Sequence, residues 1–370
     1  MNIIVTGGAG FIGRVVVRML HQKGHSVKVI DSLVEQVHGD GLVEHGLPVG
    51  LLRLSVRYAA SYFAPEGYWE DCDAVIHLAA EVGVGQSQLL PQRYADANAT
   101  QTAALWERIV KTPRIKSVIV ASSMSIYGEG LYAVNDNAMP NGGFVRPDPI
   151  DTSDWDAMLW NGVPALGLAA LKTPEDKRPE PASLYAMTKY DAEMYSLILG
   201  KAYGVRTVAL RFFNCLGPGQ ALGNAYTGVL AAFGCRALNE KPPRIWEDSR
   251  QSRDFIYVED VARAVVHATE EKLSGVYNVG TGRATTVGEL CDMVTKLVKS
   301  PKGEITGQYR SGDIRHCRSN SRKLENTGWK AQVSVEEAVA RTVEWMKTQP
   351  LPVDRHDAVL AEMAEKGLVK

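Results

Sequence analysis

A glycine-rich loop between a strand pattern and a helix pattern restricts the fold of this chain more than any other feature. The β-branched run NIIVT at 2–6 leads into TGGAGFIG at 6–13, and RVVVRMLHQKG follows with helical apolar spacing. A second run, SVKVID at 26–31, ends in Asp31. Glycines at 7, 10 and 13 allow a tight turn, a close backbone approach to a pyrophosphate and close helix packing. This order of elements predicts a βαβ unit that binds a dinucleotide.

The acid at the end of the second strand indicates which dinucleotide binds. Asp31 lies close to the spacing expected for the residue that holds the adenosine ribose hydroxyls, and its carboxylate would repel a 2′-phosphate. Ser32 and Leu33 follow it, so no arginine stands there to accept a phosphate. We therefore predict NAD rather than NADP, bound by Gly7, Gly10, Phe11, Ile12, Gly13 and Asp31.

Four further β-branched runs continue the pattern: DAVIHL at 73–78, KSVIVA at 116–121, RTVALR at 206–211 and GVYNV at 275–279. Several are apolar on both faces, as in parallel sheets covered by helices on either side. We predict a doubly wound α/β fold. Its Rossmann domain spans 1–215 and receives about 253–282, and a smaller interwoven substrate lobe is formed by 216–252 and 283–370. The stretch of about 131–181, with many Pro, Asp, Asn and Gly residues, is expected to be a partly structured insertion that forms a lid.

The overall composition restricts the partners. The formal net charge of −1 offers no basic field for nucleic acid or an anionic membrane, and no apolar run approaches a bilayer span. The five cysteines are scattered without a CxxC pair, which indicates reduced thiols and no metal site. Because the chain also enters a strand directly at its amino terminus, we expect a cytoplasmic protein.

A second motif, SLYAMTK at 183–189, carries the chemistry. Ser183 is expected to cap a helix, and Tyr185 and Lys189 are four residues apart, so they share one helix face. A tyrosine that acts as a base near neutral pH must lose roughly three units from a pKa of about 10, which corresponds to about 4 kcal/mol. Lys189 and an oxidised nicotinamide are the two positive charges expected to lower it.

Together with HLAA at 77–80, SSMSIYG at 122–128, RFFN at 211–214, RDFIYVED at 253–260, YNVGTG at 277–282 and YRSGD at 309–313, these motifs resemble the extended short-chain dehydrogenase/reductase family. Within it, most of the chain resembles the nucleotide-sugar epimerases and dehydratases. The resemblance implies that Ser123 is the catalytic hydroxyl, that Tyr185 is the base, and that Lys189 binds the nicotinamide ribose. It also places Ala79 at the cofactor.

The same resemblance implies a substrate site. Asn214, Arg253 and Arg310 match the residues that hold the diphosphate of a sugar nucleotide, and guanidinium forks suit phosphate oxygens. His77 is interpreted as a buried, hydrogen-bonded histidine rather than a catalyst. Cys317 matches a gate position where small residues admit larger sugars.

The segment after Ser123 distinguishes two reactions. The 4,6-dehydratases follow this hydroxyl residue with an Asp-Glu pair, which expels the C6 hydroxyl and removes the C5 proton. Here Met124 and Ser125 stand at those positions, and neither can move a proton in that way near neutral pH. The chain therefore resembles an epimerase that oxidises C4 transiently and reduces it again from the other face.

Among the epimerases, VGVGQS at 82–87, GPGQ at 217–220, RQSRDF at 250–255 and GDIRHC at 312–317 resemble the dTDP-L-rhamnose 4-epimerases. The expected substrate is thus a dTDP- or UDP-hexose. UDP-galactose 4-epimerases are the next alternative, although they usually have a lysine in place of Val82. Ser55 stands where an acid often contacts adenine, so adenine is expected to be held differently.

Several alternatives stay open from the sequence. They are an NAD-dependent dehydratase, a dehydrogenase or reductase of a non-nucleotide carbonyl, a C5 or 3,5-epimerase, and a non-enzymatic NAD-sensing module. We also expect a homodimer, because the helix over 185–203 carries an outer apolar stripe that includes Met194 and Ile198.

Overall fold

The computed structural model describes residues 1–38, 47, 49–60, 64–134, 137–138, 143–224, 226, 228–310 and 312–370. Its centre is a seven-stranded sheet with the order β18-β13-β5-β4-β1-β2-β3, in which all neighbouring strands are parallel. The strands are β1 (Asn2–Thr6), β2 (Ser26–Asp31), β3 (Leu51–Arg53), β4 (Ala74–His77), β5 (Ser117–Ser123), β13 (Arg206–Phe212) and β18 (Gly275–Val279).

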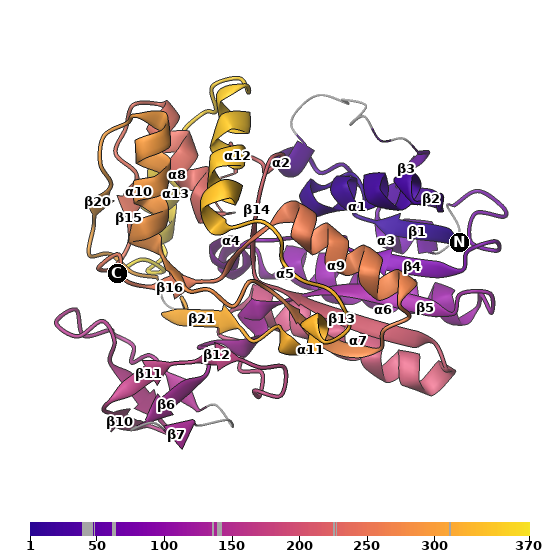
Figure 1. Ribbon diagram of the computed structural model, residues 1–370, viewed down its shortest axis with the longest axis horizontal. Helices are drawn as coiled ribbons and strands as arrows, with labels where there is room; N and C mark the ends of the chain where they lie inside the picture. Colours follow the sequence, from indigo (N-terminus) through magenta and orange to yellow (C-terminus); the bar gives the residue numbers. More distant parts are fainter. Residues whose placement is uncertain are drawn as a thin grey trace.

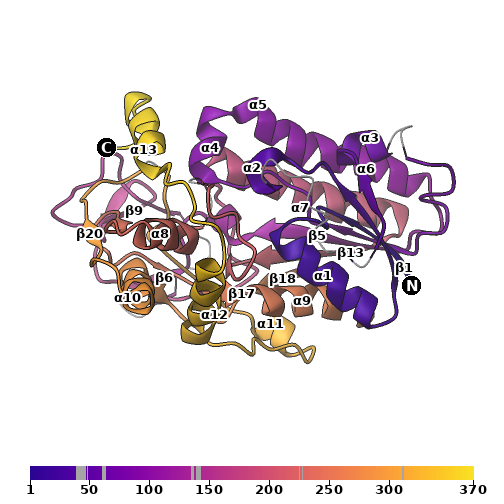
Figure 2. The ribbon, with the colours of Figure 1, turned by 90° about the horizontal axis from the view of Figure 1, so that it is seen from above.

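Helices cover both faces of this sheet (Figures 1 and 2). On β1, Ile3 and Val5 belong to one apolar cluster and Ile4 to another, so side chains of alternating direction are buried on opposite faces. One face packs against α1 (Phe11–Gln22) and α9 (Val258–Glu270); the other packs against α3 (Val56–Ala60), α6 (Gln101–Val110) and α7 (Leu184–Tyr203). The predicted doubly wound fold is confirmed. None of the described helices is long and apolar enough to cross a membrane.

Shorter elements connect the sheet to the site. After β2, β4 and β5 come α2 (Glu35–His38), α4 (Val84–Leu89), α5 (Pro91–Tyr94), the π-helix η1 (Ala95–Thr100) and the 3₁₀-helix η2 (Met124–Tyr127).

A second group of elements lies beyond the carboxyl ends of the sheet strands, at the opposite end of the molecule from the amino terminus (Figure 1). Its helices are α8 (Val229–Leu238), α10 (Val287–Val298), α11 (Arg322–Glu325), α12 (Val335–Lys347) and α13 (His356–Glu365). Its short strands are β14 (Asn214–Leu216), β15 (Arg244–Ile245), β16 (Ser252–Arg253), β17 (Phe255–Tyr257), β19 (Thr285–Thr286), β20 (Glu304–Ile305) and β21 (His316–Ser319). The division into a Rossmann domain and an interwoven lobe at the residues named above stays a prediction.

The described part of 131–181 forms small antiparallel sheets beside this group (Figure 1). Its strands are β6 (Tyr132–Val134), β7 (Asn137–Ala138), β8 (Phe144–Val145), β9 (Met158–Trp160), β10 (Val163–Ala165) and β11 (Leu168–Ala170), and β12 (Lys172–Thr173) pairs with β21. None of the described residues from 131 to 181 lines the main cavity. The expected lid is therefore wrong for this part of the chain, which packs against the side of the site.

Candidate active site

A cavity of about 730 Å³ extends from the glycine loop to α13. Its walls include residues that follow the carboxyl ends of sheet strands: Gly7 after β1, Asp31 at the end of β2, Ala79 after β4, and Ser123 at the end of β5. In open parallel sheets, ligands bind at this edge, where the strand order changes direction. The cavity thus brings together residues that are far apart in the sequence.

The glycine loop leaves room for a ligand because it lacks side chains. A Cβ atom at Gly13 would lie 2.1 Å from the Gly7 carbonyl oxygen, and one at Gly7, where φ is 69°, would lie 2.6 Å from the Ala79 nitrogen. At Gly10, the Gly7 oxygen lies 3.3 Å from an added Cβ and is the only atom of a described residue within 4 Å of it, apart from those of its chain neighbours. The open side of Gly10 therefore faces the cavity at the amino end of α1, where backbone N–H groups favour an anion.

Asp31 is buried beside this loop. Its carboxylate accepts hydrogen bonds from the backbone nitrogens of Ala9, at 3.0 Å, and Leu33, at 3.0 Å. Burial raises the pKa of Asp31, but hydrogen bonds from His38 and these backbone groups outweigh it, so the pKa lies below its usual value. The residues present fit NAD: an ionised acid stands where ribose hydroxyls would donate, and the glycine cradle lies next to it.

The predicted catalytic hydroxyls meet in the middle of the cavity. Ser183 caps α7 through its Oγ, which accepts from the Ala186 nitrogen at 3.2 Å, as the sequence predicted. The Tyr185 hydroxyl is hydrogen-bonded to Ser123. The Ser125 hydroxyl donates to the Ser123 Oγ at 2.8 Å, which leaves the Ser123 proton for the tyrosine oxygen.

The pKa of Tyr185 differs from the expectation. Burial raises it, and the hydrogen bond from Ser123 offsets only part of the rise. Burial lowers the pKa of Lys189 to about 8, while the Glu193 carboxylate opposes this change. A lysine with this pKa is still mostly charged at pH 7. The lowering of the tyrosine pKa by Lys189 and an oxidised cofactor stays a prediction.

Glu193 was not predicted, although it lies one helical turn after Lys189 on α7. Its carboxylate accepts from Arg211 at 2.6 and 3.1 Å and from the Ser122 hydroxyl at 2.6 Å. Arg211 also donates to the Tyr127 hydroxyl at 2.7 Å. This buried group ties α7 to the ends of β5 and β13, which fixes the helix that carries the tyrosine against the strand that carries Ser123.

The three predicted diphosphate residues all line the cavity. The Asn214 Oδ1 is buried and has no hydrogen-bond partner among the described residues. Arg253 donates to the carbonyl oxygens of Ser252, Ile314 and Arg315.

Arg310 pairs with Asp313 at 2.7 Å, and its guanidinium lies 5.4 Å from the centre of the Trp246 ring. Both Arg253 and Arg310 retain N–H groups beyond these contacts. Ser311, within the YRSGD motif, lies outside the described residues.

Three other predictions have clear outcomes. His77 is buried, and its ring nitrogens lie 2.7 Å from the Thr6 Oγ1 and 2.9 Å from the Thr102 Oγ1, which confirms its interpretation as a hydrogen-bonded core residue. Cys317 does not line the cavity; it packs with Met124 and neighbouring apolar residues, so it does not act as a gate here.

Leu54 and Val56 line the cavity on either side of Ser55. That these apolar side chains hold adenine in place of the usual acid stays a prediction.

One cluster resembles a metal site but is already neutralised. Cys235, Asp354 and His356 place potential ligand atoms within 4.8 Å of one another. Asp354 is paired with Arg236 and Lys241, and burial raises the pKa of the Cys235 thiol to about 11. These cations and the protonated thiol disfavour a bound cation, and the absence of a metal site stays a prediction.

Comparison with known proteins identifies the family. The sequence profile of the NAD dependent epimerase/dehydratase family matches residues 3–147 and 168–280. A dTDP-L-rhamnose 4-epimerase from Burkholderia thailandensis is 31% identical over 355 residues, which cover 93% of this chain and 94% of that protein. The chain belongs to the NAD-dependent epimerase/dehydratase family. This membership confirms the resemblance, the enzyme class and the NAD cofactor predicted from the glycine loop.

Solved structures agree with this family. The UDP-N-acetylglucosamine 4-epimerase of Methanobrevibacter ruminantium, in complex with UDP-N-acetylmuramic acid, is 29% identical with a TM-score of 0.75, and the match covers 94% of this chain and 99% of that one. The UDP-glucose 4-epimerase of Thermus thermophilus, in complex with NAD, is 27% identical with a TM-score of 0.72, and the match covers 95% and 100%. The role of each site residue in this family member stays a prediction.

Proposed function

We propose that this protein inverts C4 of a dTDP- or UDP-hexose, with dTDP-L-rhamnose as the first choice of substrate. The observation that carries the proposal is the hydroxyl pair of Ser123 and Tyr185 beside an NAD cradle, with Met124 and Ser125 lining the cavity in place of an acid pair.

The carboxylates in the cavity support an epimerase over the alternatives. Among the described residues, the four acids that line it are Asp31, Glu81, Glu247 and Asp313. Asp31 accepts backbone N–H groups, Glu81 pairs with Arg93 at 2.8 Å, and Glu247 and Asp313 are each paired with an arginine. Expulsion of a C6 hydroxyl or exchange of a C5 proton needs a further acid or base. None of these four is available for that role.

In the proposed reaction, Tyr185 removes the proton of the C4 hydroxyl, and Ser123 donates a hydrogen bond to the same oxygen. When bound, NAD supplies a reversible hydride acceptor. Lys189 adds positive charge beside the ribose. Asn214, Arg253 and Arg310 hold the diphosphate while the 4-keto sugar rotates and presents the opposite face of C4 to the cofactor. Tyr185 then returns its proton to the C4 oxygen, so that the hydroxyl forms again on the inverted carbon.

The product of a substrate panel tests this proposal. Incubation with dTDP-L-rhamnose should give its C4 epimer at unchanged mass, without net NADH and without solvent deuterium at C4. Incubation with dTDP-glucose should give no product lighter by one water. Tyr185→Phe should abolish turnover and retain NAD and the sugar nucleotide. Deuterium at C4, or loss of water, would refute the mechanism.

UDP-glucose is the second candidate substrate. A UDP-glucose 4-epimerase from Mycolicibacterium smegmatis is 28% identical over 94% of this chain and 99% of that protein. The same panel includes UDP-glucose and UDP-galactose, so epimerisation of these sugars alone would replace dTDP-L-rhamnose without changing the mechanism.

We also infer a homodimer and a cytoplasmic location. On α7, Met187, Tyr195 and Ile198 are exposed and Met194 is half-buried, which leaves an apolar stripe for a second copy. Light scattering should show a dimer at micromolar concentration, and Ile198→Glu should yield the monomer. All five cysteines are free thiols, as expected in a reducing compartment.

A further inference from the structure

One segment beside the cavity has no part in the proposed mechanism: residues 363–370, from the end of α13 onward. Met363 is buried and lines the cavity. Gly367 follows the helix with a φ of 69°, and the Leu368 nitrogen donates back to the Met363 oxygen at 2.9 Å. A glycine in this left-handed conformation, closed by such a bond, ends a helix and turns the chain away from its axis. The turn directs residues 368–370 out of α13.

The turned residues pair with the backbone at Arg310. The Tyr309 nitrogen donates to the Lys370 oxygen at 3.0 Å, and the Lys370 nitrogen donates to the Tyr309 oxygen at 2.9 Å. Arg310 and Val369 form the next pair of this antiparallel bridge. Directly opposite residues of an antiparallel pair have their side chains on the same face, with Cβ atoms about 5 Å apart. Val369, which is buried, therefore lies beside Arg310.

Contacts of Tyr309 and Lys370 hold this bridge in place. The Tyr309 hydroxyl accepts from the Ile150 nitrogen at 3.0 Å, and the centres of the Tyr309 and Trp155 rings are 6.1 Å apart. The Lys370 side chain pairs with Asp148, but the two side chains are 39% and 47% exposed. An exposed ion pair of this kind adds little stability. The main-chain bonds of Lys370, rather than its charge, therefore fix it beside Tyr309.

Gly85 of α4 shows how closely the Arg310 guanidinium is enclosed. A Cβ atom added to Gly85 would lie 2.7 Å from the Arg310 Nη1 and 2.8 Å from the Met363 Cε. Both distances are too short for a van der Waals contact between such atoms. The guanidinium and the end of Met363 thus both lie against the space that the missing side chain leaves. An alanine at this position would displace both side chains.

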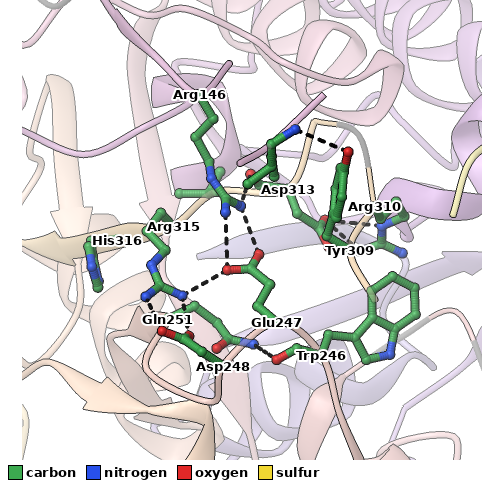
Figure 3. A network of polar contacts seen from close by, with 12 residues as sticks. Arg146, Trp246, Glu247, Asp248, Gln251, Tyr309, Arg310, Asp313, Arg315 and His316 are labelled. Carbon is green, nitrogen blue, oxygen red and sulfur yellow. Dashed lines mark hydrogen bonds and ion pairs between the residues drawn. The ribbon is translucent and has the colours of Figure 1, made fainter. Parts of the chain in front are cut away.

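The remaining contacts of Arg310 leave one nitrogen for a ligand. Its Nε and Nη2 donate to the Asp313 Oδ1 at 3.0 and 2.7 Å, and the guanidinium lies 5.4 Å from the centre of the Trp246 ring (Figure 3). Among the described residues, Nη1 has no acceptor. A guanidinium presents its N–H groups in one rigid plane, so the position of that plane decides whether Nη1 reaches a phosphate oxygen.

We propose that residues 363–370 are a positioning element for Arg310, which holds the guanidinium between Met363, Val369 and Gly85 at the place where it binds the substrate diphosphate. This inference rests on the proposed function, because it takes Arg310 as a diphosphate ligand. A long arginine side chain that is already ordered loses less conformational entropy when the ligand binds. The element therefore acts on affinity for the diphosphate and not on the proton transfer at C4.

Calorimetric titration of the NAD-loaded protein with inorganic pyrophosphate and with UDP tests this role. Gly85→Ala, which displaces the guanidinium, and Lys370→Pro, which removes the N–H that pairs with Tyr309, should each weaken both probes about tenfold. Lys370→Met loses only the exposed ion pair and should weaken them less than twofold. Gly50→Ala, whose Cβ would have no described residue beyond its chain neighbours within 4 Å, is the matched control for the glycine.

A double-mutant cycle separates positioning from a general structural effect. Arg310→Met should weaken both probes by itself. In that background Gly85→Ala and Lys370→Pro should cause no further loss, because the residue through which they act is gone. In the single variants, KM for the sugar nucleotide should rise about tenfold while kcat changes less than twofold. Melting temperatures equal to that of the original protein exclude unfolding as the cause.

Each outcome has one meaning. If Arg310→Met weakens the probes but Gly85→Ala and Lys370→Pro do not, the positioning role alone is refuted. Equal losses with and without the Arg310 side chain also refute it. If Arg310→Met weakens neither probe, the diphosphate assignment fails and the positioning role falls with it. If the cycle is as expected but no sugar nucleotide in the panel is epimerised, the positioning role stands and the proposed function fails.

Discussion

The substitution Glu193→Gln separates the structural role of this buried acid from its electrostatic role. Glu193 lies on α7 and contacts Ser122 of β5 and Arg211 of β13. Glu193 is 1% exposed, and its oxygens accept from Arg211 at 2.6 and 3.1 Å. An amide in its place would turn an NH₂ group toward the guanidinium donors. Removal of one partner from a buried ion pair costs about 3–5 kcal/mol, because the other charge stays buried. We expect the free energy of unfolding to fall by this amount.

The same substitution should change how NAD binding depends on pH. Burial lowers the pKa of Lys189 to about 8, and the charge of Glu193 opposes this change. At pH 7 a pKa of about 8 leaves roughly ten charged lysines for each neutral one. Without the carboxylate the pKa of Lys189 falls further, so the positive charge that is predicted to lie at the ribose is lost at a lower pH. NAD affinity should therefore decline above pH 8 in the original protein and begin to decline earlier in Glu193→Gln.

Urea unfolding at pH 7 and NAD titration from pH 6 to 9 measure these two effects. Glu270→Gln is the matched control, since Glu270 pairs with Lys23 at 2.6 Å but is 30% exposed. A surface pair of this kind contributes at most about 1 kcal/mol. If both glutamate substitutions have similar small costs, or if the pH dependence of NAD binding is the same in both, the reasoning is refuted.

Three other predictions concern single residues. Burial lowers the pKa of His77 to about 3, so stability is full above pH 6.5 and falls toward pH 3 by about 1.4 kcal/mol per unit; urea unfolding of His77→Gln should show a shallower decline. Gly13→Ala, whose Cβ would lie 2.1 Å from a loop oxygen, should lose NAD during gel filtration, unlike Gly50→Ala, whose Cβ would have no described residue beyond its chain neighbours within 4 Å. Ser125→Ala should lower kcat/KM less than about tenfold and Ser123→Ala a hundredfold or more; equal losses would contradict the supporting role of Ser125.

The parts of the fold that could be predicted are those that a short, continuous stretch of sequence specifies. The loop from Thr6 to Gly13 contains its own turn geometry, and the β-branched runs at β1, β2 and β18 match the observed strands at both ends. Strand β3 (Leu51–Arg53) was not predicted, because three residues at the edge of a sheet carry too little periodicity. The short strands of 132–173 were missed for the same reason.

Residues of the candidate site could be predicted only where they belong to a recognisable sequence motif. The hydrogen bond between Ser123 and Tyr185 joins residues that are distant in the sequence, and the family resemblance, rather than periodicity, placed them together. Glu193 had a usable signal, because it follows Lys189 by one helical turn, but its partner Arg211 comes from another strand. The pKa of Tyr185 could not be read from the motif, since it depends on how deeply the phenol is buried.

The described part of the insertion supports the end of the cavity near Trp246 without lining it. Glu247, in the turn after Trp246, has a φ of 55°, a conformation that a residue with a side chain rarely adopts and that neighbouring contacts must hold. Two buried arginines bind its carboxylate: Arg146 of the insertion at 2.7 Å and Arg315 at 2.8 Å (Figure 3). Arg315 also pairs with Asp156 of the insertion at 2.8 Å. Because such a network is stable only when every charge is paired, loss of the insertion would leave Arg315 and Glu247 under-compensated and release the turn that carries Trp246. The insertion is thus part of the site through charge pairing, although it contributes no lining side chain.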